Sequence, residues 1–249
     1  MTRLLASVRS PEEAQIALDG GADIIDLKEP AHGALGRLAD AVIRDILGTV
    51  GGRRPVSATI GDLPLAPLPV RRAVEAMAAT GVDIVKLGIF AGDAAATLAT
   101  LAPIARDIRL VAVSFGDRPL DLEIVRRAGD AGFHGVMLDT AEKRGGPLTR
   151  HLSAAALADF LDLARAGDLL AGLAGSLSAA DLPLLLPLRP DFLGFRSALT
   201  RGGREAPLDA AAVARLRLAI AQSNATAAAG AQSDAAAATA ASAAGIVSA

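Results

Sequence analysis

The lysine amines are the side chains of this sequence best suited to covalent chemistry. Of the 25 basic residues only Lys28, Lys86 and Lys143 are lysines, and the others are arginines. An arginine keeps its proton in a protein, whereas a lysine can lose it, and the neutral amine attacks carbonyl carbons. Because ordinary surface charge is supplied by arginine, the three lysines predict imine formation and proton transfer.

Carboxylates and apolar runs surround these lysines. Asp26 stands two residues before Lys28, so on an extended strand both side chains point to the same side. Lys86 lies inside an apolar run, where burial would lower its pKa. Asp139 ends another apolar run, four residues before Lys143. We expect these five residues to form a catalytic set, with Lys28 as the nucleophile. The alternatives are surface lysines in loops and ion pairs that only close the end of a fold.

A second group of residues predicts a phosphate site. Gly175 and Ser176 lie in a glycine- and serine-rich turn that enters a helix, where free backbone N–H groups can bind phosphate. Arg196 and Ser197 follow the next expected strand and add a guanidinium and a hydroxyl. The alternative is a structural turn, because turns of this composition are also common without a ligand.

Composition excludes several other classes of function. The chain has no cysteine, tryptophan or tyrosine, only three scattered histidines, and a net charge of −2. Disulfides, thiol chemistry and histidine metal sites are therefore not expected, nor is nucleic-acid binding. No stretch reaches the roughly 18 apolar residues that a membrane span needs, and no targeting segment is recognised. We expect a cytoplasmic protein with no metal or redox cofactor and no membrane partner, and a homo-oligomer remains open.

Strand-like runs alternate with helical patterns along the chain. The expected strands are Arg3–Val8, Asp23–Leu27, Pro55–Ile60, Asp83–Gly88, Arg109–Val113, Gly135–Asp139, Leu169–Ala174 and Asp191–Arg196. This alternation predicts an α/β protein, a single (β/α)8 TIM-type barrel over 1–220, with a doubly wound open sheet as the alternative. The lysines then fall at the strand ends where barrel active sites form. Residues 221–249 are an Ala/Ser-rich, low-complexity tail, expected to be disordered or, alternatively, an Ala-rich helix.

Several motifs together resemble one family, the (5-formylfuran-3-yl)methyl phosphate synthases, over residues 3 to about 220. These motifs are GGADIIDLK (20–28), VSATIGD (56–62), VKLG (85–88), MLDTA (137–141) with Lys143, and LAGS (173–176).

The resemblance implies a lysine-dependent barrel enzyme. Its members are carbon–oxygen lyases of methanofuran-type cofactor biosynthesis, in methanogens or in bacteria with one-carbon metabolism. They join two molecules of glyceraldehyde 3-phosphate into a furan aldehyde phosphate, with loss of phosphate and two waters. The resemblance makes Lys28 the Schiff-base lysine and Lys86 the acid/base lysine, and Asp26, Asp139 and Lys143 match other active-site positions. Other interpretations remain: a class I aldolase, a type I dehydratase, or a barrel that binds a phosphorylated metabolite without turnover.

Overall fold

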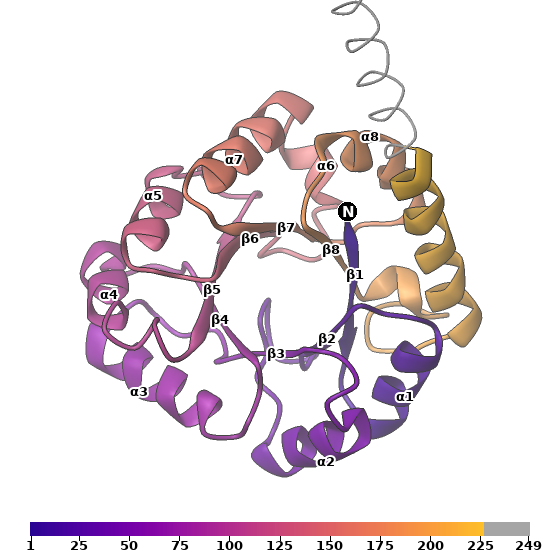
Figure 1. Cartoon of the computed structure of the whole chain (residues 1–249), viewed down its shortest axis with the longest axis horizontal. Coiled ribbons are helices and arrows are strands. Elements are labelled where there is room, and N and C mark those ends of the chain that lie inside the picture. Colours follow the sequence, from indigo (N-terminus) through magenta and orange to yellow (C-terminus); the bar gives the residue numbers. More distant parts are fainter. Residues whose placement is uncertain (227–249) are drawn as a thin grey trace, which may run out of the picture.

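Eight parallel strands close into a barrel in the order of the sequence, as the computed structural model of the chain shows (Figure 1). The structure describes residues 1–226. The strands are β1 (Arg3–Val8), β2 (Ile24–Leu27), β3 (Val56–Thr59), β4 (Ile84–Gly88), β5 (Arg109–Phe115), β6 (Gly135–Asp139), β7 (Leu170–Leu173) and β8 (Phe192–Phe195). Since β1 pairs with both β2 and β8, the predicted (β/α)8 barrel is confirmed and the open sheet is wrong.

Helices form an outer ring around the strands (Figure 1). They are α1 (Pro11–Asp19), α2 (Asp40–Val50), α3 (Pro67–Ala78), α4 (Ala94–Leu101), α5 (Glu123–Asp130), α6 (Leu148–His151), α7 (Ala154–Ala166) and α8 (Leu182–Leu185), with short 3-10 turns at Ala179–Asp181, Leu186–Leu188 and Ser197–Leu199. Ser10 caps α1 by accepting a hydrogen bond from the Glu13 N–H at 3.3 Å, as a serine before proline favours.

A last helix over 210–226 runs past the boundary expected at 220. Its Val213 and Ile220 side chains are buried, and Asn224 lies beyond them. The Asn224 amide donates to the Thr2 carbonyl at 2.9 Å and accepts from the Thr2 N–H at 3.0 Å. Residues 221–226 thus continue the last helix, and Asn224 joins this helix to the residue that precedes β1. The remainder, 227–249, lies outside the described residues.

The barrel interior is apolar at one end and charged at the other. Leu5, Ile24, Val111 and Phe192 belong to an apolar cluster inside the barrel, separate from the larger core between strands and helices. Gly172 leaves room for the Phe192 ring, because a Cβ at this glycine would lie 2.0 Å from it. Toward the ends of the strands the buried side chains are instead charged or hydroxylated. The buried charged groups of the interior therefore lie toward one end; they are Asp26, Lys28, Lys86 and Asp139.

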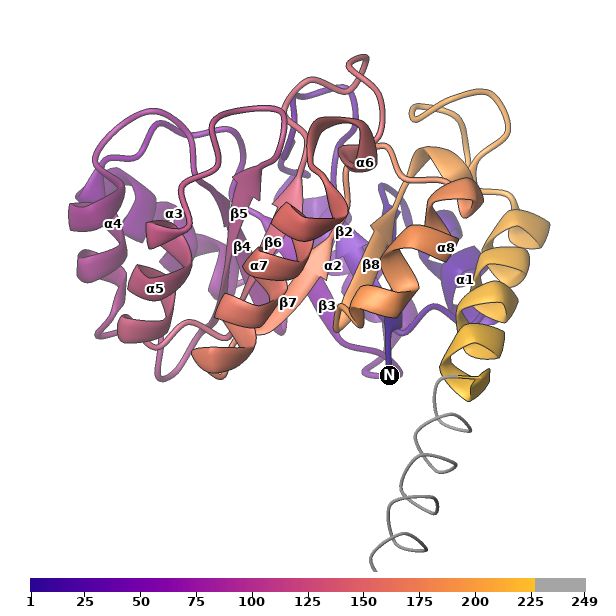
Figure 2. The same cartoon turned by 90° about the horizontal axis from the view of Figure 1, so that it is seen from above.

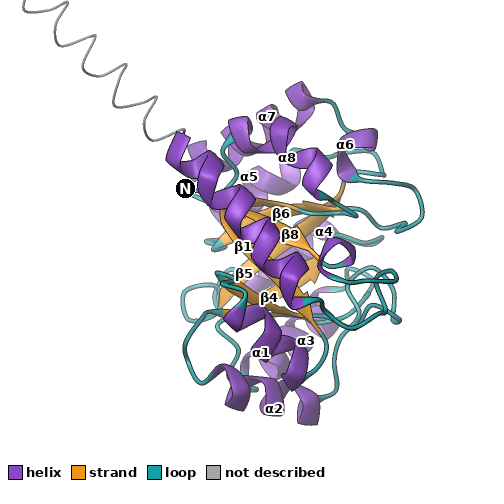
Figure 3. Cartoon of the chain, turned by 90° about the vertical axis from the view of Figure 1, so that its right-hand side faces the viewer, coloured by secondary structure: helices purple, strands orange, loops and turns teal. Residues whose placement is uncertain are grey.

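The long connecting loops gather at the end of the barrel where the strands finish, opposite the N-terminus (Figures 2 and 3). This is the end that carries the active site in TIM-barrel enzymes. None of the helices in the described part of the chain has the length and apolar character needed to cross a membrane.

Candidate active site

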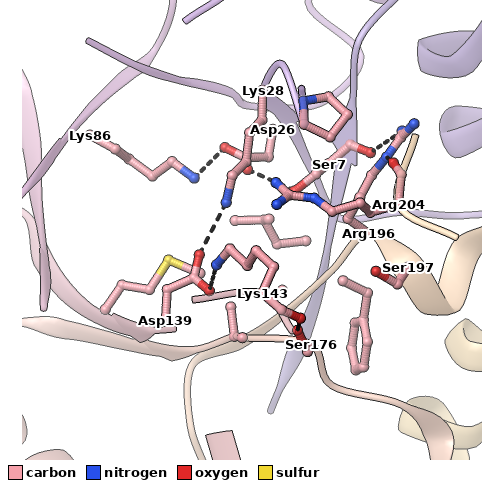
Figure 4. A pocket seen from close by; sticks show the side chains of 17 residues that line it. Ser7, Asp26, Lys28, Lys86, Asp139, Lys143, Ser176, Arg196, Ser197 and Arg204 are labelled. Atoms are coloured by element: carbon pink, nitrogen blue, oxygen red, sulfur yellow. Dashed lines mark hydrogen bonds and ion pairs between the residues drawn. The ribbon is translucent and has the colours of Figure 1, made fainter. Parts of the chain in front are cut away.

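The three lysines and the two aspartates meet at this end of the barrel. Lys28, Lys86, Lys143, Asp26 and Asp139 line one inner cavity of ≈ 40 Å³ (Figure 4). They come from β2, β4, β6 and the loops that follow β2 and β6. The structure therefore brings together every member of the catalytic set that was expected from the sequence.

Asp26 and Lys86 form the deeper of two ion-pair clusters. Lys86 lies in the middle of β4, farther inside than the strand end where it was expected, and its amine contacts the Asp26 carboxylate. Asp26 also accepts hydrogen bonds from the hydroxyls of Ser7 (2.9 Å) and Ser57 (2.6 Å) on the neighbouring strands. Burial lowers the pKa of Lys86, and the charge of Lys28 adds to this, while the charge of Asp26 opposes it. Lys86 is therefore an amine that gives up its proton more readily than an ordinary lysine.

Asp139 holds the other two amines. Its Oδ2 accepts from the Lys28 amine at 3.1 Å, and its Oδ1 accepts from the Lys143 amine at 2.6 Å and from the Thr140 N–H at 2.7 Å. Burial alone would raise the pKa of Asp139, but the Lys143 and Lys28 ammonium groups outweigh it and hold the pKa below its ordinary value. Burial lowers the pKa of Lys143 to about 8, against the opposing charge of Asp139. Asp139 is thus a carboxylate at neutral pH.

Three amines share two carboxylates in this cluster, so their charges cannot all be balanced. The Lys28 charge lowers the pKa of both Lys86 and Lys143, and Figure 4 shows its amine between theirs. Repulsion and burial both favour loss of a proton from one of the three. The site can therefore supply a neutral amine for attack beside ammonium groups that donate protons.

The Gly175–Ser176 turn lies at the same cavity. Both residues have positive φ, +99° and +49°, and a Cβ at position 175 would approach the Thr140 nitrogen to 2.8 Å, so glycine is required there. The Ser176 hydroxyl donates to the Lys143 carbonyl at 3.3 Å. Within residues 1–226, neither the Gly175 nor the Ser176 N–H has a hydrogen-bond acceptor. These two N–H groups can bind an anion beside Lys143.

Arg196 has a different environment from the one expected for a phosphate ligand. Its guanidinium makes a two-fold ion pair with the buried Glu13 of α1. Its remaining hydrogen bonds go to the carbonyl oxygens of Ser7, Arg204 and Ala206. All five N–H donors are thereby used within the protein, so Arg196 has none left for phosphate and instead joins the end of β8 to α1. Ser197 lines the cavity and is exposed.

Two kinds of site residue escaped prediction from the sequence. Arg204, in the loop after β8, lines the inner cavity, and no motif in its local sequence marks it. Ser7 and Ser57, the hydroxyls on Asp26, could have been found as polar residues at inward positions of apolar strands.

A wider outer cavity of ≈ 770 Å³ adjoins the inner one. The two cavities share Pro30, Lys143, Ser197 and Arg204. The inner cavity has room for only a few water-sized groups, whereas the outer cavity has the volume of a small-molecule site. The four shared residues therefore line the passage between the lysines and the outer cavity. Within the described residues no cluster of three or more histidine or acidic side chains is arranged to hold a metal ion.

The family of the chain follows from its sequence as a whole. A family model described as 4-HFC-P synthase matches residues 4–217, which is nearly the whole barrel. The chain belongs to the 4-HFC-P synthase family.

Curated relatives of this family share much of the sequence. A protein of Methylorubrum extorquens, provisionally named (5-formylfuran-3-yl)methyl phosphate synthase, is 44% identical over 86% of this chain and 89% of its own length. The (5-formylfuran-3-yl)methyl phosphate synthase of Methanosarcina mazei is 35% identical over 86% of this chain and 97% of its own. That of Methanopyrus kandleri is 37% identical over 81% and 90%. The family resemblance inferred from the motifs is confirmed.

Solved structures share the fold at low sequence identity. Phosphoribosyl anthranilate isomerase from Thermus thermophilus has a TM-score of 0.64 at 18% identity, covering 89% of this chain and 99% of its own. Thiamine phosphate pyrophosphorylase from Pyrococcus furiosus has a TM-score of 0.63 at 13% identity, covering 89% and 96%. At such identities the likeness concerns the barrel alone.

Proposed function

We propose that this member of the 4-HFC-P synthase family condenses two molecules of glyceraldehyde 3-phosphate into (5-formylfuran-3-yl)methyl phosphate. One phosphate and two waters are released, so all atoms of the two trioses are accounted for. Carbon is neither oxidised nor reduced overall, and the reaction needs no redox cofactor. The observation that supports this best is the cluster of three amines around Asp26 and Asp139 at the end of the barrel.

Lys28 is the amine that we assign to imine formation. It lies closer to the opening than Lys86, with 8% of its surface exposed against 2%. Its amine adds to the carbonyl carbon of a triose phosphate in the ketone form, and the carbonyl oxygen leaves as water. Loss of a proton from the neighbouring carbon gives an enamine. That carbon then forms the new bond to the carbonyl carbon of the second triose phosphate, whose oxygen takes up a proton.

The other two lysines, each with its carboxylate, carry the proton transfers. Lys86 on Asp26 lies on the inner side of Lys28, and Lys143 on Asp139 lies toward the opening. A buried amine of lowered pKa can take a proton from carbon and later give one to a leaving oxygen. These transfers serve isomerisation, loss of phosphate and the two dehydrations. Cleavage of carbon–oxygen bonds makes the enzyme a carbon–oxygen lyase, and final hydrolysis of the imine returns Lys28.

Each of the two triose phosphates carries an anionic phosphate group, so the enzyme needs sites that bind phosphate. The N–H groups of Gly175 and Ser176 lie at the cavity beside Lys143 and fit one phosphate. Ser197, on the wall shared by both cavities, adds a hydroxyl.

The test is incubation of the pure protein with glyceraldehyde 3-phosphate, followed by mass spectrometry. A product with the mass of the furan aldehyde phosphate is expected, together with one inorganic phosphate per product. Furan formation can also be followed in the near ultraviolet, because the chain has no tryptophan or tyrosine. A six-carbon sugar that keeps both phosphates would show a class I aldolase instead. Absence of any covalent adduct after borohydride would show a barrel that only binds its ligand.

A further inference from the structure

Arg204 reaches over the end of the barrel from the loop between the Ser197–Leu199 turn and the last helix. Its guanidinium donates to the Gly33 carbonyl, in the loop after β2, at 3.3 Å. Figure 4 shows the guanidinium directed into the pocket, whereas that of Arg196 turns away. Arg204 also lines both cavities, so it stands where the inner cavity opens into the outer one.

The other cations that line the inner cavity all have carboxylate partners. Lys86 pairs with Asp26, Lys28 and Lys143 pair with Asp139, and Arg196 pairs with Glu13. For the Arg204 guanidinium, by contrast, no carboxylate oxygen of residues 1–226 lies within 4.0 Å, and its one hydrogen bond to those residues is the contact with the Gly33 carbonyl. A guanidinium keeps its charge under all physiological conditions. Arg204 therefore adds a positive charge with unused donors to a site where amines already outnumber carboxylates.

We propose that Arg204 binds the phosphate of the second triose phosphate. This rests on the function proposed above. The inner cavity of ≈ 40 Å³ cannot hold two trioses, so the second must lie in the outer cavity of ≈ 770 Å³ until its carbonyl meets the enamine. Arg204 is the guanidinium at the passage between the two, and a planar guanidinium binds phosphate through two parallel hydrogen bonds.

The place of this phosphate differs from that of the first. The Gly175–Ser176 turn follows β7 and contacts the Lys143 segment, whereas Arg204 is tied to Gly33 beside β2. One phosphate is thus held on the β6–β7 side of the opening and the other between the loops after β8 and β2. With one phosphate bound on each side of the opening, the carbonyl carbons of both trioses point toward Lys28.

The test is a calorimetric titration with glycerol 3-phosphate, which has no carbonyl and forms no imine. The wild type should bind two equivalents, and Arg204→Ala should keep one while the other weakens roughly 10- to 100-fold. Arg204→Lys, which keeps the charge without the planar pair of donors, should give an intermediate affinity. Arg201→Ala is the matched control, because this arginine is in the same loop, is 74% exposed and pairs with Asp209 at 2.5 Å; it should bind two equivalents.

Thermal melting of each variant shows that the fold survives. Two equivalents of unchanged affinity in Arg204→Ala, or a single equivalent in the wild type, would overturn the proposal. Measuring furan formation by the wild type and by Arg204→Ala distinguishes failure of this inference from failure of the proposed function. If the wild type makes no furan and Arg204→Ala still loses one equivalent, the anion site stands and the function fails. If the wild type makes furan while Arg204→Ala binds and turns over normally, the function stands and this inference is wrong.

Discussion

Replacing Glu13 by glutamine should destabilise the barrel without weakening substrate binding. Glu13 and Arg196 form a buried two-fold ion pair, with side-chain exposures of 5% and 10%. Glutamine keeps the size and one acceptor oxygen of glutamate but leaves the Arg196 charge unpaired. Breaking a buried pair in this way costs about 3–5 kcal/mol, and we expect the lower end because carbonyl oxygens still surround the guanidinium.

Thermal and urea unfolding measure this loss. For a domain of this size about 3 kcal/mol corresponds to a fall in Tm of roughly 6–12 °C. The control is Glu75→Gln, because Glu75 is 45% exposed and pairs with Arg71 on the surface of α3; its loss should be about 0.5 kcal/mol or less. If Glu13→Gln unfolds like this control, or raises KM for glyceraldehyde 3-phosphate at unchanged stability, Arg196 serves the substrate and its structural role is refuted.

Three further predictions concern the amines and the last helix. The pKa of Lys143 lies at about 8, so the neutral fraction of its amine grows as the pH rises through 8. A reaction rate that depends on the neutral amine should therefore rise in this range, and the rate–pH profile of Lys143→Met should lack that rise. Lys86→Ala should still be trapped as a covalent triose adduct by borohydride but make no furan; furan release at the normal rate would refute its acid/base role. Asn224→Ala should lower the free energy of unfolding by about 1–2 kcal/mol, because it loses both hydrogen bonds to Thr2. The control variant Gln222→Ala should change the free energy of unfolding little. Equal stability of the two variants would show that the hydrogen bonds to Thr2 do not contribute.

The barrel could be predicted because each strand carries its own local signal. Short apolar runs alternate with helical patterns eight times along the chain, and a glycine or proline turn leads into most of these runs. The lysines could be placed near the strand ends for the same reason. Their depth could not be predicted: Lys86 lies at the third of five positions of β4, and only closure of the barrel brings it beside Asp26.

The two arginines after β8 show where local reasoning ends. Arg196 and Arg204 stand eight residues apart, and nothing in the nearby sequence says which guanidinium keeps donors free toward the cavity. The answer depends on Glu13, 183 residues away, which takes the Arg196 guanidinium. Likewise, the last helix continues to residue 226, where Asn224 bonds to Thr2, 222 residues away. The composition of this segment shows that it has few large apolar side chains, but it cannot show that a polar side chain will bond to a residue at the other end of the chain.

The most direct test of the proposed chemistry is to locate the covalent adduct. The wild type is mixed with glyceraldehyde 3-phosphate, reduced with borohydride, digested and sequenced by mass spectrometry. We predict a reduced triose phosphate on Lys28 in the wild type and in Lys86→Ala, and no adduct in Lys28→Arg, which keeps the positive charge but lacks the nucleophile. An adduct on Lys86 or Lys143 in the wild type, or retained labelling in Lys28→Arg, would contradict the assignment of Lys28 as the nucleophile.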